Sequence, residues 1–176
     1  MFRGLIKVGV AVVLASALAG CGFQPLYGEH AGGVRTDAEL ARVLVVPLDS
    51  GRTGQDVYNA LINRLSPNGE PVNPDYQLNV TLNEEREGVA IERDASITRY
   101  NYLLLARYRL VDTRTGNVVH EGESRSIASY NVVDSQFSTL MARRDAEERA
   151  ATELSEDIKL RLAIFFDRQL SSGNDT

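Results

Sequence analysis

The sequence predicts one α+β domain whose elements follow the order β-α-β-β-β-α. Two periodicities carry this prediction. Apolar and polar residues alternate from Tyr76 to Asn83, and apolar residues recur at three-and-four spacing in two other segments. Because each element is apolar on one face only, the most economical arrangement packs a layer of helices on a layer of strands. A chain of 176 residues is long enough to bury such a core.

The first strand and the first helix are expected between residues 42 and 65. The segment Arg42–Leu48 is apolar and rich in valine, which indicates a short buried strand with Pro47 at its end or at a sheet edge. An amphipathic helix follows and ends at Ser66-Pro67. Its apolar face contains Val57, Tyr58, Leu61, Ile62 and Leu65.

Three further strands are expected to form a meander. The alternating strand that begins at Tyr76 continues weakly past Gly88, where a bulge is expected, and Asp94–Ser96 is a plausible turn. The next strand carries one apolar side, formed by Tyr100, Tyr102, Leu104, Ala106, Tyr108 and Leu110. A short hairpin loop at Asp112–Asn117 leads to the last strand, from Val118 to about Tyr130.

A long amphipathic helix closes the domain. Its apolar stripe is formed by Leu140, Ala146, Ala150, Leu154, Ile158, Leu162 and Phe165. Residues 42–170 are therefore assigned to a single domain and residues 171–176 to a polar tail that frays. Residues 21–41 are assigned to a tether, because Pro25 and several glycines disfavour regular structure there.

Residues 1–20 have the pattern of an export signal. Arg3 and Lys7 precede an uncharged run from Val8 to Ala19, which is shorter than the roughly twenty residues that a membrane-spanning helix needs. The sequence Leu18-Ala19-Gly20-Cys21 resembles the bacterial lipobox, which implies cleavage before Cys21 and acylation of that residue. The alternative is an ordinary secretory signal with a chance cysteine at the cut. Gly22 in place of aspartate favours sorting to the outer membrane, again by resemblance.

Composition argues against several functional classes. The only cysteine is Cys21, which excludes an intramolecular disulfide framework, and His30 and His120 lie far apart, so no metal or cofactor is predicted. No nucleophile and base occur at motif spacing, and the neighbouring carboxylates of Glu84-Glu85 would point to opposite faces of a strand. The formal net charge of −5, which becomes −7 without Arg3 and Lys7, argues against nucleic-acid binding.

Positive charge nevertheless gathers in two segments. Between Ile97 and His120 four arginines accompany a single acid, and Arg143 and Arg144 stand together in a stretch without acids. Guanidinium groups suit bidentate contacts with phosphates and carboxylates. The residues alone leave two interpretations open: a solvated sheet face with an ordinary start of a helix, or a site for an anionic amphiphile.

The run Cys21-Gly22-Phe23-Gln24-Pro25-Leu26-Tyr27-Gly28 resembles the start of the LptE family of lipopolysaccharide-assembly lipoproteins, and the later strands and helix are similar to that family too. The resemblance implies two helices on one face of a four-stranded sheet and no enzymatic activity. It implies a plug that helps to assemble the outer-membrane β-barrel LptD and that binds lipopolysaccharide. The matching basic positions are Arg93 and Arg144, with Arg143 beside the latter. An auxiliary lipoprotein of an ABC-type lipid transporter remains the alternative.

Overall fold

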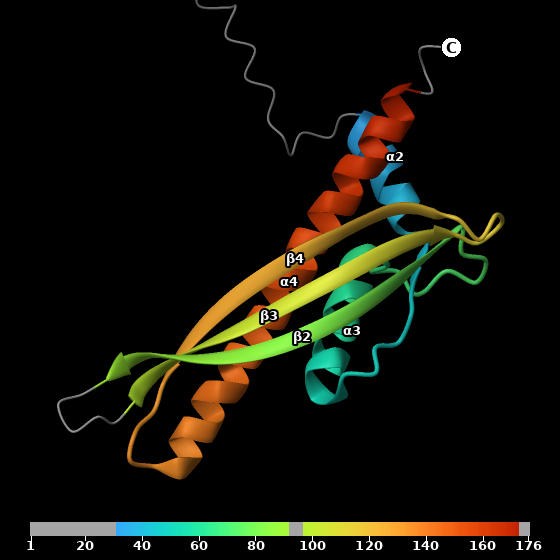
Figure 1. The fold of residues 1–176 in the computed structure, drawn as a ribbon. Helices are drawn as coiled ribbons and strands as arrows, with labels where there is room; N and C mark the ends of the chain where they lie inside the picture. Colours follow the sequence, from blue (N-terminus) through green and yellow to red (C-terminus); the bar gives the residue numbers. More distant parts are fainter. Residues whose placement is uncertain (1–30, 92–96, 173–176) are drawn as a thin grey trace, which may run out of the picture.

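The structure is a computed structural model that describes residues 31–91 and 97–172 (Figure 1). From residue 43 onward its elements follow the order β-α-β-β-β-α, so the order predicted from the sequence is confirmed, and one further helix precedes them. The elements are α2 (Ala31–Leu40), β1 (Val43–Val45), α3 (Gly51–Leu65), β2 (Tyr76–Ile91), β3 (Ile97–Asp112), β4 (Val118–Asn131) and α4 (Gln136–Ser172).

The four strands form one sheet in the order β1-β2-β3-β4. β1 runs parallel to β2 and pairs only with Tyr76–Leu78, whereas β2, β3 and β4 pair antiparallel over nearly their whole lengths. The register shifts between Gly88 and Ile91, which confirms the bulge expected beyond Gly88. The turn expected at Asp94–Ser96 lies outside the described residues.

One face of the sheet is covered by α3 and α4, which lie on the same side of it in Figure 1. Alternate residues of β3 form the buried face, as the sequence alternation predicted: Tyr102, Leu104, Ala106, Tyr108 and Leu110. The opposite face is mixed: it contains the exposed Arg107 and Arg109 and also the apolar Leu103, Leu105 and Ile127. We call it the open face, because no helix among the described residues packs on it.

The helix α4 is 37 residues long, which corresponds to about 55 Å. Its buried residues follow the predicted stripe from Ala146 to Leu162. Near the C-terminal end the structure differs from the prediction, because Phe166 is fully buried while Phe165 is half-buried against His120. Position 166 lies one i,i+4 step beyond Leu162, so it continues the stripe that faces the core.

The assignment of residues 21–41 to an irregular tether was wrong for residues 31–40, which form α2. α2 packs on α4, and its Leu40 side chain is 1% exposed. Burial of an apolar face against a neighbouring helix stabilises a short helix more than intrinsic propensity does. The Gly32-Gly33 pair, which favoured an irregular chain, therefore does not prevent the helix.

The hairpin between β3 and β4 is held by Asp112. Its Oδ1 accepts the backbone N–H groups of Arg114 at 2.9 Å and Thr115 at 2.8 Å. These bonds, the Thr115 backbone N–H first, lower the pKa of Asp112. Gly116 has φ +72°, a conformation that L side chains rarely adopt, so a glycine suits this position of the predicted hairpin loop.

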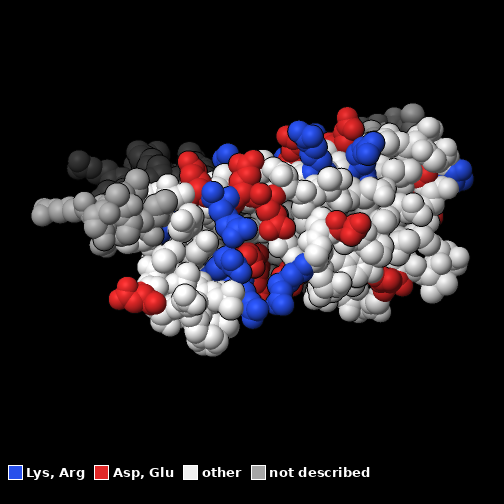
Figure 2. Space-filling view, turned by 60° about the horizontal axis from the view of Figure 1, so that its bottom comes forward, with Lys and Arg blue, Asp and Glu red and all other residues white. Residues whose placement is uncertain are grey.

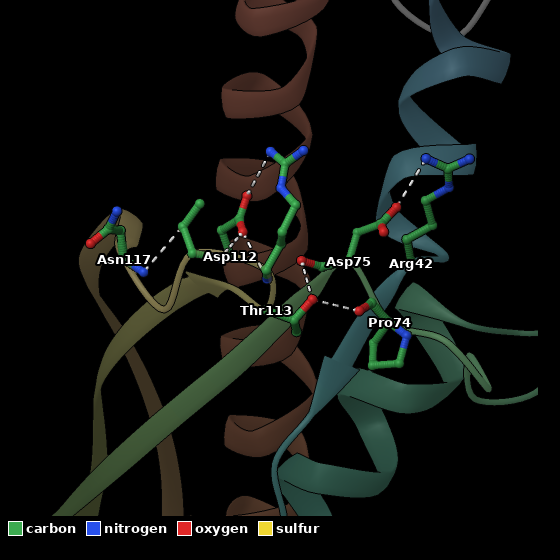
Figure 3. A network of polar contacts seen from close by, with 8 residues as sticks. Arg42, Pro74, Asp75, Asp112, Thr113 and Asn117 are labelled. Atoms are coloured by element: carbon green, nitrogen blue, oxygen red, sulfur yellow. Dashed lines mark hydrogen bonds and ion pairs between the residues drawn. The ribbon is translucent and has the colours of Figure 1, made fainter.

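The same hairpin is joined to the segment that leads into β2 (Figure 3). Thr113 Oγ1 donates to the carbonyl groups of Pro74 at 2.8 Å and Asp75 at 3.0 Å, and the Asp75 carboxylate pairs with Arg42 at 3.0 Å. These contacts fix the end of the sheet next to β1. The other end, which we call the distal end, is where β4 stops and α4 begins.

Candidate functional site

A pocket of about 550 Å³ opens at the distal end of the sheet. One residue from each of β2, β3 and β4, the segment between β4 and α4, and the first turns of α4 form its wall. We call it the distal pocket, and its lining residues are Arg86, Tyr100, Tyr130, Val132, Val133, Gln136, Thr139, Leu140 and Arg143. It combines two guanidinium groups with aromatic and aliphatic side chains.

Strand register brings the two tyrosines together. Tyr100 on β3 is the direct partner of Tyr130 on β4, and their rings stack with centroids 5.7 Å apart. The sequence alternation placed Tyr100 on the apolar side of its strand and Tyr130 at the end of the next strand. In the structure Tyr130 belongs to the buried core and both rings line the pocket.

The aliphatic wall is held by Thr139. Its Oγ1 donates to the Val133 carbonyl at 3.0 Å and accepts the Val133 N–H at 3.1 Å. The Val132 N–H donates to the Thr98 carbonyl at 2.8 Å, which continues the β3–β4 pairing beyond Asn131. The segment between β4 and α4 is thus tied to β3 through Val132 and to α4 through Val133.

The two arginines come from different elements. Arg143 on α4 is 37% exposed, and its Nε lies 3.4 Å from Glu147 Oε1, one helical turn away, without a hydrogen bond. Arg86 on β2 is exposed and has no described hydrogen bond or ion pair. A guanidinium group donates in a planar fork that matches phosphate and carboxylate oxygens. The pocket can therefore hold an anionic group between β2 and α4.

Apolar side chains continue outside the pocket. Val133, which belongs to its wall, is 51% exposed, and Phe137 and Met141 in the first turns of α4 are 71% and 44% exposed. Phe137 and Met141 are four residues apart and so share one face of α4. Exposed apolar groups beside cationic ones suit a ligand that has both hydrocarbon chains and negative charge.

Beneath the distal half of the sheet lies a buried polar contact. The Tyr102 hydroxyl donates to Glu84 Oε2 at 2.8 Å and lies 3.3 Å from Thr53 Oγ1. Burial raises the pKa of Tyr102, so the hydroxyl stays protonated at neutral pH. The contact joins β2, β3 and the start of α3 beside the distal pocket. Glu85 points to the open face instead, as strand alternation requires.

Charge on the face drawn in Figure 2 is mixed rather than separated. Figure 2 shows basic and acidic side chains next to each other in a band across the molecule, with largely uncharged surface beside it. Among the described ranges no group of His, Cys, Asp and Glu side chains could hold a metal ion. A search of the same ranges found no helix with the length and apolarity to cross a membrane.

The structure places the predicted site residues in different positions relative to the pocket. Arg143 lines the distal pocket, whereas its neighbour Arg144 is exposed on α4 and is not part of the lining. Cys21 and Arg93 lie outside the described residues. Arg86 was missed, although it is in phase with Leu78, Val80 and Leu82, the residues on the helix side of β2. Extending that alternation through Glu84 to Arg86 would have placed it on this side.

Solved structures with the same fold come from several bacteria. A Caulobacter crescentus CB15 protein assigned as a lipoprotein is 25% identical, covers 76% of this chain and 96% of its own, and has a TM-score of 0.65. A minor lipoprotein from Acinetobacter baumannii is 16% identical over 70% of this chain and 92% of its own, with a TM-score of 0.57. Rare lipoprotein B from Shewanella oneidensis is 12% identical over 73% of this chain and 98% of its own, with a TM-score of 0.54.

Sequence comparison finds the uncharacterized protein RP188 of Rickettsia prowazekii, which is 24% identical over 158 residues, or 90% of this chain and 96% of that protein. The fold and the pocket thus define a small α+β protein of the kind found among bacterial lipoproteins. The sequence model of the LptE family, described as Lipopolysaccharide-assembly, matches residues 40–162. The chain therefore belongs to the LptE family, a family of non-enzymatic lipopolysaccharide-assembly lipoproteins.

Proposed function

We propose that this protein plugs the outer-membrane β-barrel LptD, helps that barrel to assemble, and binds lipopolysaccharide at the distal pocket on its way to the outer leaflet. Membership of the LptE family supports the first two activities. The observation that carries the third is the distal pocket itself, where Arg86 and Arg143 stand beside Tyr100, Tyr130 and Leu140.

The chemistry of lipopolysaccharide matches that combination. Its lipid A part carries phosphates, which guanidinium groups can pair with two oxygens at a time, and acyl chains, which can lie against apolar side chains. Removal of the signal would leave a net charge of −7 on the chain, so long-range attraction would not deliver an anion. Binding depends on the two arginines at short range. Arg93 and Arg144 remain candidates for additional contacts.

The open face of the sheet supports the plug. From Gln77 to Glu87 the side chains of β2 on this face are amides, a hydroxyl and acids. Those of β3 and β4 include exposed arginines and glutamates, beside the apolar Leu103, Leu105 and Ile127. The lumen of a large outer-membrane barrel is polar, so such a face can form hydrogen bonds with it. Acyl chains on Cys21 would hold the protein at the periplasmic side of the outer membrane, because two or three chains anchor firmly while one does not.

The test is isolation of the protein from mildly solubilised outer membrane. We expect the LptD barrel to be recovered with it in about equal amount. Recovery of a lone lipoprotein would contradict the plug, and recovery with inner-membrane transporter components would favour an auxiliary subunit of an ABC-type lipid transporter. Mass spectrometry of the N-terminal peptide tests acylation of Cys21 in the same sample.

A further inference from the structure

The strand β2 has a long unpaired edge. The last backbone contact that β1 makes with β2 is the hydrogen bond from the Val46 N–H to the Leu78 carbonyl, at 3.0 Å. Pro47 follows and has no N–H to extend the pairing. Because β2 continues to Ile91, its edge beyond Leu78 has no strand partner among the described residues.

The register determines which backbone groups of this edge are free. Tyr76 and Leu78 direct their N–H and carbonyl groups toward β1. Along a strand, successive residues direct these backbone groups alternately to one neighbouring strand and to the other. Odd-numbered residues from Asn79 to Glu87 therefore bond to β3. The even-numbered residues direct their groups outward: Val80, Leu82, Glu84, Arg86 and Gly88. We call this segment the β2 edge.

The β2 edge is accessible. A hollow of about 480 Å³ lies where β1 leaves the sheet, and its lining includes Pro47, Leu48 and Val80 together with Arg109 from the open face. Beyond it, every residue from 83 to 89 is exposed. The opposite edge of the sheet is different, because Arg149 on α4 donates to the outward carbonyl of Ser129 on β4 at 3.2 Å.

The β2 edge is acidic. Glu84, Glu85 and Glu87 surround the single Arg86, and Glu85 and Glu87 lie on the open face. Charged side chains on an edge strand disfavour pairing with an identical strand, which here would bring two acidic segments together. The same charges favour a segment that carries lysine or arginine, since complementary charge selects the partner.

We propose that the β2 edge binds an extended, basic segment of a partner polypeptide, which adds a fifth strand to the sheet. In strand addition the backbone hydrogen bonds supply affinity and the side chains on alternate positions supply specificity. The outward groups from Val80 to Gly88 match a segment of about nine residues. This proposal rests on the sheet topology and is independent of the function proposed for the distal pocket.

The test uses the chain from residue 22 and a synthetic nonapeptide of alternating threonine and lysine. Hydrogen exchange of single amides is measured by NMR with and without the peptide. We expect the N–H groups of Leu82, Glu84 and Arg86 to exchange at least about tenfold more slowly in the complex. Those of Asn83 and Glu85 already bond to β3 and should not change.

A matched pair of variants separates strand addition from simple charge attraction. Glu87→Lys and Glu121→Lys make the same charge change on the open face, one beside the β2 edge and one on β4. We expect Glu87→Lys to weaken peptide binding several-fold and Glu121→Lys to leave it unchanged. The proposal would be overturned if both variants weakened peptide binding equally, if the peptide protected β4 amides instead, or if no binding occurred at millimolar peptide. Protection of the β2 edge that rises with protein concentration in the absence of peptide would also overturn it, because the partner would then be a second copy of this chain.

Discussion

The Tyr102 hydroxyl donates a hydrogen bond of 2.8 Å to Glu84, and the Tyr102 ring is fully buried while the Glu84 side chain reaches solvent. The contact connects the middle of the sheet to the exposed part of β2. It therefore couples the core to the β2 edge. Tyr58 makes a bond of the same length to Glu70 at the surface, which provides a comparison.

We expect Tyr102→Phe to lower the free energy of unfolding by about 1–2 kcal/mol, because a partly buried hydrogen bond to a carboxylate is lost. Tyr58→Phe removes the surface bond and should cost about 0.5 kcal/mol or less, since solvent replaces it. Urea denaturation of both variants measures the difference. Equal losses of unfolding free energy in the two variants would show that the Tyr102 hydrogen bond contributes no more to stability than the exposed one.

For the distal pocket, Arg143→Glu is expected to weaken binding of purified lipopolysaccharide about tenfold, which corresponds to ~1.4 kcal/mol. Arg86→Glu should have a similar effect, because it removes the guanidinium on the opposite wall. Arg144 lies outside the pocket lining and could add only a peripheral contact, so Arg144→Glu on the same helix should weaken binding less than Arg143→Glu does. If Arg144→Glu weakens binding as much as Arg143→Glu does, the site lies elsewhere on the surface of α4.

Gly122 on β4 lies directly opposite Tyr108 on β3. A Cβ at position 122 would lie 2.5 Å from Tyr108 Oη and 2.8 Å from its Cζ. Because the Tyr108 ring is buried, we expect Gly122→Ala to destabilise the fold by about 1–3 kcal/mol. The double variant with Tyr108→Phe should recover part of this loss. Additive effects in a double-mutant cycle would contradict the steric explanation.

Stability should also depend on pH through His120, whose ring stacks on Phe165 with centroids 4.7 Å apart. Burial lowers the pKa of His120 from its ordinary 6.5, and the charge of Arg161 acts in the same direction. The folded state then binds the proton less tightly than the unfolded state does. The stability that neutral His120 contributes is therefore lost as the pH falls from about 6.5 through the lower folded pKa.

Urea titrations between pH 7.5 and pH 4.5 should show the free energy of unfolding decreasing in that interval, and His120→Phe should flatten the curve. Asp112 provides a contrast, because its lowered pKa means that its contribution is present above an ordinary value of 3.8 and is lost only at more acidic pH. An unchanged slope in His120→Phe would assign the decrease to other groups.

Leu40→Ala tests the helix α2. Leu40 is 1% exposed, so its truncation should cost about 2–5 kcal/mol. Arg35 is exposed on the same helix, and Arg35→Ala should change the free energy of unfolding by about 0.5 kcal/mol or less. A small effect of Leu40→Ala would mean that α2 adds little to the stability of the domain.

Most of the fold could be predicted from the sequence because its strands are long and buried on one face only. The alternation around Leu78 and in the Tyr102 strand leaves little choice of register. The α2 helix could not be predicted, since it depends on packing against α4, about a hundred residues away in the chain. The pocket required the Tyr100–Tyr130 pairing and the position of Arg86, and neither is visible without the strand register.

The length of α4 sets a spacing within the molecule. This helix begins at the distal pocket, and its C-terminal part lies beside α2 in Figure 1. Ala31, the start of α2, lies ten positions after Cys21, and ten residues span at most about 36 Å when fully extended. This reach is less than the ~55 Å of α4. If Cys21 is acylated and lipopolysaccharide binds in the distal pocket, both as proposed, the protein would act as a spacer that holds the bound lipid away from the leaflet in which it is itself anchored.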